Sequence, residues 1–159
     1  PVSLEPVRAI ADNFGVSLLA AALRFVELTS ERCALVFSRA GHIVWAARSP
    51  TFQPFIERGR RLDPSSLACD WFSGGRVYES PQLVPFDAWV SDDGAEDAEL
   101  QEQVFVVSGT DGVASLLWIP EAAACLLESR GADAADRHRA SASYAQAHRA
   151  VARVHLRER

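Results

Sequence analysis

The run EQVFVVSGTDGVASLLWI, residues 102–119, decides the fold of this 159-residue chain. Two segments rich in apolar residues flank the tetrapeptide GTDG, which is typical of a hairpin turn. Strands that lie inside a sheet carry more apolar residues than strands at its edges. We therefore expect this hairpin to lie at the centre of an antiparallel sheet.

Further strands are expected upstream of this hairpin. Residues 33–37 and 42–46 flank a connection that contains Gly41, and this pattern predicts a second hairpin. Residues 82–90 predict another strand, which Pro85 interrupts. Because proline cannot donate a backbone hydrogen bond, this strand should lie at an edge of the sheet or contain a bulge.

A helix is expected between these strands. Asp63 is a typical capping residue, and Pro64 is suited to the first position of a helix. Gly74 and Gly75 should end the helix. Its apolar stripe consists of Leu67, Ala68, Trp71 and Phe72.

The first thirty residues predict a pair of helices. Ser3 can cap the first helix and Gly15 can end it, while Ser17 is suited to cap a second helix over residues 18–28. Two short helices joined through Gly-Val-Ser are typical of a helix-turn-helix motif. The apolar face of the first helix would comprise Leu4, Val7, Ile10, Ala11 and Phe14.

The order of these elements predicts an α+β fold, in which helices cover one side of an antiparallel sheet. We expect a helix-turn-helix-like module over residues 1–30, a sensor-like domain over 31–130 and a basic helix or tail over 131–159. From residue 130 onward the chain holds seven arginines against three acidic residues. The apolar stripe of this tail is thin, so it packs on the sheet, forms a homodimer through its helix, or frays.

Composition excludes several classes of protein. No apolar run approaches the length of a membrane span, and the first residues lack the pattern of a secretion signal, so we expect a cytoplasmic protein that enters no membrane. The three cysteines, at positions 33, 69 and 125, are odd in number and widely spaced. They predict reduced thiols, mostly buried, in place of a disulfide framework or a metal site.

The sequence contains no complete catalytic motif. It lacks H-E-x-x-H, G-x-S-x-G and a phosphate-binding loop. A thiol nucleophile at Cys69 would require a histidine placed by the fold, and His42 is the candidate outside the tail. We therefore expect no enzymatic activity, no metal and no cofactor.

Four tryptophans offer the clearest candidate for a ligand site. Trp45, Trp71, Trp89 and Trp118 belong to different predicted elements and could line one concave surface. Arg48 would then contact an anionic group. The speculative ligand-binding set is Trp45, Arg48, Cys69, Trp71 and Trp89, and the alternative is that these tryptophans pack in the core.

The predicted helix pair has the shape of a DNA-binding helix-turn-helix motif, but it lacks the side chains that such motifs use to bind DNA. Residues 1–30 hold two arginines and three acidic residues, and the second helix is apolar on more than one face. Recognition helices place polar or basic side chains near their first turn. We therefore expect the pair to connect two domains and not to bind DNA.

Three stretches carry a resemblance to a known family. They are ADNFGVSLLAAALRFVELT at 11–29, CALVFSRAGHIVW at 33–45 and SPTF at 49–52. Together they resemble the segment that follows the peptidase domain in the ImmA/IrrE family of bacterial zinc metallopeptidases. The likeness extends over residues 1–120 and does not cover the basic tail.

The resemblance implies a helix-turn-helix-like linker followed by a GAF-like sensor domain. In that family a zinc-binding H-E-x-x-H helix lies upstream, and the peptidase cleaves a helix-turn-helix repressor during stress. No position of this sequence matches that motif, so no catalytic residue is carried over. Either this chain is a C-terminal fragment or the protein is not a protease.

We therefore expect a non-catalytic regulatory or sensor region of an ImmA/IrrE-type metalloprotease. Its expected partner is a helix-turn-helix repressor protein or a small-molecule ligand. The alternative is a helix-turn-helix transcription regulator that binds DNA and carries a small-molecule sensor domain. An independent enzyme is the third hypothesis.

Overall fold

A computed structural model describes residues 3–91, 97–125 and 127–128. Residues 1–124 form one compact unit, and the fold described below belongs to it. The expected basic tail, 131–159, lies outside the described residues. The elements are α1 (Leu4–Phe14), α2 (Leu18–Leu28), β1 (Cys33–Arg39), β2 (His42–Arg48), α3 (Leu67–Gly74), β3 (Gln82–Pro85), the short 3-10 helix η1 (Phe86–Ala88), β4 (Glu99–Val106) and β5 (Gly112–Trp118).

The five strands form one antiparallel sheet in the order β2-β1-β5-β4-β3. β5 lies in the middle and all of its residues are buried, which confirms the prediction that the second hairpin occupies the centre. β3 lies at an edge, as Pro85 predicts. The strand predicted over 82–90 is too long, because Phe86 turns into η1 after its amide bonds to the carbonyl of Ala98.

The turn between β1 and β2 contains two residues with positive φ, Ala40 at 50° and Gly41 at 74°. Two such residues in succession define the turn that matches the twist of a short hairpin. The hairpin predicted around Gly41 is confirmed, and both of its strands extend two residues further than expected.

The helix pair also forms as predicted. Gly15 adopts a φ of 62° at the end of α1, and the hydroxyl of Ser17 accepts a hydrogen bond from the amide of Ala20 at the start of α2. Ser3 occupies the capping position of α1, but its side chain makes no capping bond. Within the described residues no single helix is long and apolar enough to cross a membrane; α1 and α2 reach that length only together, across a bend of 116°.

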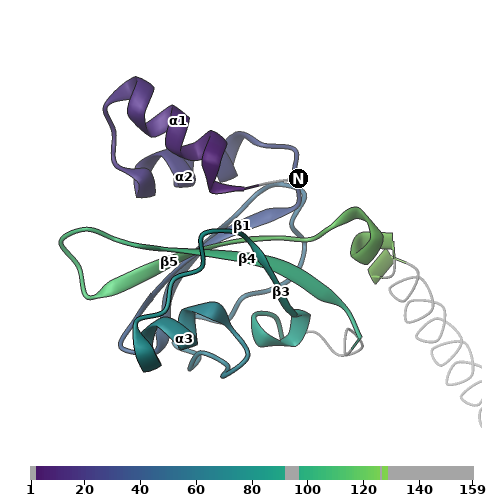
Figure 1. The fold of residues 1–159 in the computed structure, drawn as a ribbon. Coiled ribbons are helices and arrows are strands. Elements are labelled where there is room, and N and C mark those ends of the chain that lie inside the picture. The colour runs from purple at the N-terminus through teal and green to yellow at the C-terminus, as the bar shows by residue number, and fades with distance from the viewer. Residues whose placement is uncertain (1–2, 92–96, 126, 129–159) are drawn as a thin grey trace, which may run out of the picture. The chain divides into compact units, whose positions relative to one another are not determined.

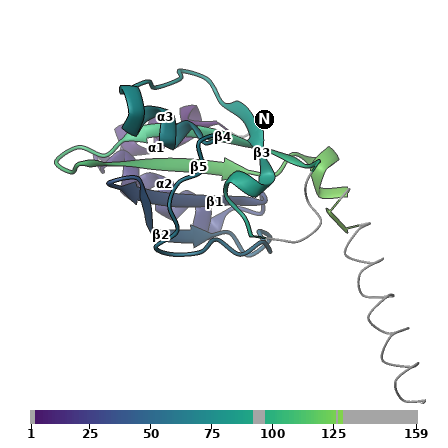
Figure 2. The same ribbon diagram turned by 90° about the horizontal axis from the view of Figure 1, so that it is seen from below.

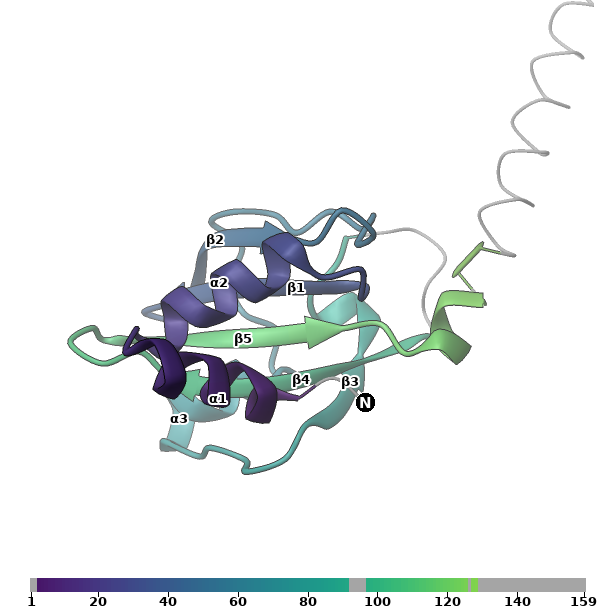
Figure 3. The same cartoon turned by 90° about the horizontal axis from the view of Figure 1, so that it is seen from above.

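α1 and α2 pack on one face of the sheet (Figure 3). The helices and the strands beneath them share a single apolar core, so the helix pair belongs to the same compact unit as the sheet. The buried members of this core are Leu4, Val7, Ala11, Ala21, Ala22, Val26, Cys33, Leu35, Phe37, Phe105, Val107, Ala114, Leu116 and Trp118.

α3 lies on the opposite face of the sheet from the helix pair (Figures 1 and 2). The expectation that helices cover only one side is therefore wrong. The physical reason is that β5 and six of the seven residues of β1 are buried, so both of their faces must be covered. α3 begins at Leu67 with Ser66 as its cap, later than Asp63 and Pro64 predict, because Asp63 first forms a turn by accepting from the amide of Ser65.

Candidate functional site

Two consecutive polar residues lie inside the sheet on β4. Glu102 is fully buried, and Gln103 has 6% of its surface exposed. Successive side chains of a strand point to opposite faces. Glu102 therefore faces α3 and Gln103 faces α1, and we call these two residues the polar centre.

Glu102 accepts four hydrogen bonds. Its Oε1 accepts from the amide of Ala68 and the hydroxyl of Ser115, both at 3.0 Å. Its Oε2 accepts from the amide of Leu67 and the indole Nε1 of Trp89, both at 2.9 Å. One carboxylate thus holds together the first turn of α3, the residue after η1 and the central strand β5.

Burial is the main influence on the charge of Glu102. Removal from water raises the pKa of its carboxyl group, while the four donors act in the opposite direction. The net direction is upward. The folded protein therefore holds a proton on Glu102 at pH values where an exposed glutamate has lost it.

Gln103 connects two segments on the other side of β4. Its Oε1 accepts from the amide of Leu4, the first residue of α1, at 2.9 Å. Its Nε2 donates to the carbonyl of Glu79 at 2.9 Å, in the loop between α3 and β3. Gln103 therefore supplies the acceptor that Ser3 does not provide for α1.

The polar centre positions chain segments. Both side-chain groups of Gln103 and both oxygens of Glu102 are bonded to protein atoms. Within the described ranges, no three histidine, cysteine or acidic side chains gather as metal ligands would. The arrangement ties helices on both faces to one strand.

The four tryptophans do not meet in one concave surface. Trp45 stacks on Phe37 at 5.7 Å on the face of the helix pair, where Trp118 also lies in the shared core. Trp89 is buried on the opposite face against Glu102. Trp71 belongs to α3 and contacts Phe72 edge-on at 4.8 Å.

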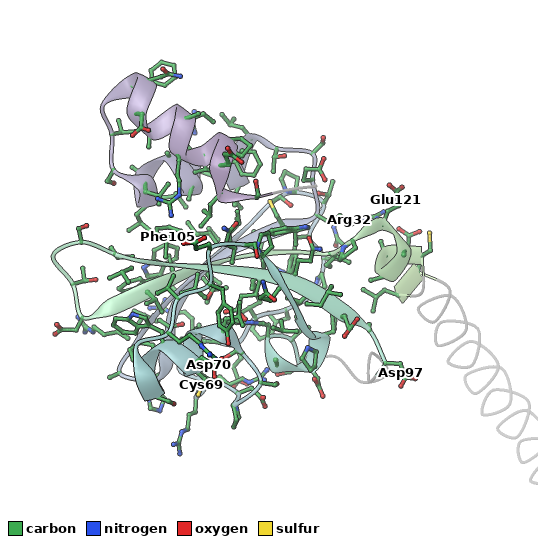
Figure 4. The ribbon with its side chains drawn as sticks, viewed as in Figure 1. Arg32, Cys69, Asp70, Asp97, Phe105 and Glu121 are labelled. Carbon is green, nitrogen blue, oxygen red and sulfur yellow. The ribbon has the colours of Figure 1, made fainter. Side chains whose placement is uncertain are left out.

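The other two expected ligand contacts are also separate. Arg48 lies at the end of β2, and its Nη1 donates to the carbonyl of Pro54 at 3.0 Å. Cys69 lies on α3, on the side of the sheet opposite the helix pair, as Figure 4 shows beside Asp70. Of the five expected residues, Cys69 and Trp71 share one helix, and ligand binding by this set remains a prediction.

The thiols are less buried than expected. Cys33 is buried beneath the helix pair, and this burial raises the pKa of its thiol to about 11. Cys69 is half-buried and Cys125 is exposed. The expectation that the cysteines are mostly buried is therefore wrong for two of the three.

Sequence reasoning did not single out Glu102 or Gln103. The hairpin was expected to begin at Glu102, and a charged residue in a central strand is itself an unusual feature. A buried carboxylate requires several donors, so its position in the strand could have indicated a structural role. Its partners could not be found from the sequence, because Leu67 and Ala68 lie 35 and 34 positions away.

Comparison with models of known protein families gives no match, and a search of curated proteins gives no significant match.

Proposed function

We propose that this chain is a non-catalytic regulatory region of an ImmA/IrrE-type metalloprotease. In this proposal the sheet with α3 is a GAF-like sensor domain, and α1 and α2 connect it to the rest of the protein. The family in this proposal comes from the sequence resemblance alone. The observation that supports a regulatory role is the polar centre, since consecutive residues of β4 hold helices on opposite faces of the sheet.

A regulatory region must link the place where a signal binds to the place where the response occurs. Here a displacement of α3 acts on the Glu102 carboxylate through the amides of Leu67 and Ala68. The neighbouring residue, Gln103, holds the first amide of α1. A change at α3 therefore reaches the helix pair through a single strand.

The helix pair suits the role of a connector. Each helix buries three residues in the core shared with the sheet, so its position is fixed relative to β1 and β4. On the outer side of α2, Arg24 bonds to Glu27 at 2.9 Å. In this ion pair, an acidic residue of the same helix neutralises the one arginine of α2.

The reading frame upstream of Pro1 tests the class of the parent protein. An H-E-x-x-H helix in that frame would support the proposal. The functional test then compares zinc-dependent cleavage of a helix-turn-helix repressor by the whole protein with cleavage by a form that lacks residues 1–128. Cleavage that responds to stress only in the whole protein is the expected result. A start codon directly before Pro1, or a response unchanged by the deletion, would overturn the proposal.

The second candidate is a transcription regulator whose helix pair binds DNA. The bend of 116° between α1 and α2 favours it, because helix-turn-helix motifs have similar angles. Phosphate contacts make DNA binding steeply dependent on salt. A mobility-shift titration of the chain against duplex DNA at two salt concentrations separates the candidates, and salt-sensitive binding at micromolar protein would favour the regulator.

A further inference from the structure

Three basic side chains lie in one row beside the turn between β1 and β2. Arg39, the last residue of β1, is paired in register with His42, the first residue of β2. On the other side of His42, Arg61 forms an antiparallel bridge with it. Directly paired residues of antiparallel strands present their side chains on the same face. We call Arg39, His42 and Arg61 the basic row.

The backbone fixes the spacing within the basic row. The bridge between His42 and Arg61 is framed by two hydrogen bonds of 2.9 Å, from Ile43 N to Arg60 O and from Leu62 N to Gly41 O. This pattern is that of a non-hydrogen-bonded pair, in which side chains approach most closely. The three side chains therefore come from a rigid hairpin and its paired neighbour.

Among the described residues, no ion pair neutralises the two guanidinium groups of the basic row. Arg39 and Arg61 are exposed, and neither makes an ion pair or a side-chain hydrogen bond within the part of the chain that the structure describes. The imidazole of His42 is oriented by Nδ1, which lies 2.9 Å from the carbonyl of Ala40.

The neighbouring arginines behave differently. Arg58 donates from Nε to the carbonyl of Val44 at 2.9 Å, and Arg60 donates to the carbonyl of Asp87 at 2.7 Å. Arg58 therefore fastens its segment to β2, and Arg60 fastens it to η1. In the part of the chain that the structure describes, the guanidinium groups of Arg39 and Arg61 make no such bond.

We propose that the basic row binds a phosphate group of a small molecule. Arg39 and Arg61 lie on either side of His42, so their positive charges repel each other, and a bound anion removes that repulsion. A guanidinium offers two parallel N–H donors, which match the oxygens of a phosphate. Two guanidinium groups, one on each side of the imidazole of His42, supply two positive charges and so match a phosphate dianion. A carboxylate carries one negative charge and would pair with only one guanidinium group.

The surroundings of the basic row favour a small ligand over a polymer. Asp111 precedes Gly112, the residue paired with Arg39, and Glu57 and Asp63 lie on either side of the segment that carries Arg61. The whole chain has a formal net charge of −5. A net negative chain repels the many phosphates of a nucleic acid more strongly than it repels one small anion.

The test follows the imidazole signals of His42 by NMR during titration with inorganic pyrophosphate. The double variant Arg39→Gln/Arg61→Gln removes both guanidinium groups, and Arg8→Gln/Arg24→Gln removes the same charge from the helix pair. We expect a saturable shift for the wild type and the helix-pair variant. We expect affinity to fall by at least about tenfold for the basic-row variant. Circular dichroism checks that each variant is folded.

Three results would overturn the proposal. The first is an equal affinity of the basic-row variant and the wild type. The second is a shift that sodium acetate reproduces at the same ionic strength, which would show general screening only. The third is a shift with a short DNA duplex and none with pyrophosphate, which would assign the row to nucleic acid. None of these results depends on whether the regulatory function proposed above is correct.

Discussion

The carboxylate of Glu102 is buried, and each of its oxygens accepts two hydrogen bonds, so its stability depends on four donors. Glu102→Gln keeps the size of the side chain but replaces one oxygen with an NH2 group. The two donors that faced that oxygen then lose their acceptor. We expect the free energy of unfolding to fall by about 1–3 kcal/mol, measured by urea denaturation at neutral pH.

Glu102 also predicts that the free energy of unfolding depends on pH. Because burial raises the pKa of Glu102 above the ordinary value of 4.5, the folded chain binds more protons than the unfolded chain between these two values. The free energy of unfolding due to this group therefore decreases as pH rises through that interval. Below the ordinary value the contribution is constant, since both states are then protonated.

Urea denaturation from about pH 4 upward, for wild type and Glu102→Gln, measures this effect. The difference between the two proteins should shrink as pH rises through the interval and then level off. The contribution of Asp63 cancels in this difference. Its lowered pKa changes the free energy of unfolding in the opposite sense, but equally in both proteins. A difference independent of pH would contradict the prediction.

Gln103 predicts a local effect at the start of α1. Gln103→Ala removes the acceptor of the Leu4 amide and the donor to the Glu79 carbonyl. We expect a loss of about 1–2 kcal/mol and faster hydrogen exchange in the first turn of α1, measured by NMR. Gln101→Ala is the matched control, since Gln101 lies on the same face of β4 with no side-chain hydrogen bond described. Equal effects of the two variants would argue against the capping role.

At the scale of elements, the close approach of β1 and β5 depends on one glycine. A Cβ at Gly112 would lie 2.6 Å from the ring of Phe37 and 2.7 Å from the carbonyl oxygen of Ser38. The backbone oxygen cannot rotate away as a flexible side chain can. Gly112→Ala should therefore lower the free energy of unfolding by about 1–3 kcal/mol in thermal or urea denaturation.

Gly74→Ala provides the control for this prediction. Gly74 lies at the end of α3, and a Cβ there meets no atom within 4 Å. Alanine favours helix over glycine by up to about 1 kcal/mol. Gly74→Ala should be neutral or stabilising, and an equal loss in both variants would exclude crowding at Gly112 as the cause.

Elements were predicted best where a local signal decides them. α2 has the predicted bounds, because Ser17 caps its start and its apolar pattern is continuous. The start of α3 was predicted too early, since Asp63 and Ser66 are both suited to cap a helix and the sequence does not rank them. The strand at 82–90 was predicted too long because the turn after Pro85 depends on a bond to Ala98.

At the scale of the whole molecule, the α+β class and the antiparallel sheet could be predicted, but the side on which each helix packs could not. Local patterns show which residues are apolar, and they do not show which face of the sheet receives each helix. The polar centre could not be predicted for the same reason. Gln103 and Leu4 are 99 positions apart, so only the complete fold brings them together.

Cys33 reports on the stability of the whole compact unit. It is buried in the core that the helix pair shares with the sheet, and burial raises its pKa to about 11. In a Cys69→Ser/Cys125→Ser background, its reaction with a disulfide reagent at about pH 8 should require opening of the helix pair. The rate should be far below that of the urea-unfolded chain and should rise with added urea. A rate equal to that of the unfolded chain would contradict this packing.

The adjacency of Glu102 and Gln103 also restricts how the gene can change. Insertion of one codon upstream within β4 would rotate every later side chain to the other face, so the carboxylate would face α1 and the amide would face α3. An insertion of two codons would preserve the faces but shift the pair along the strand. Length variation among descendants of this gene should therefore be confined to the turns, with β4 constant in length.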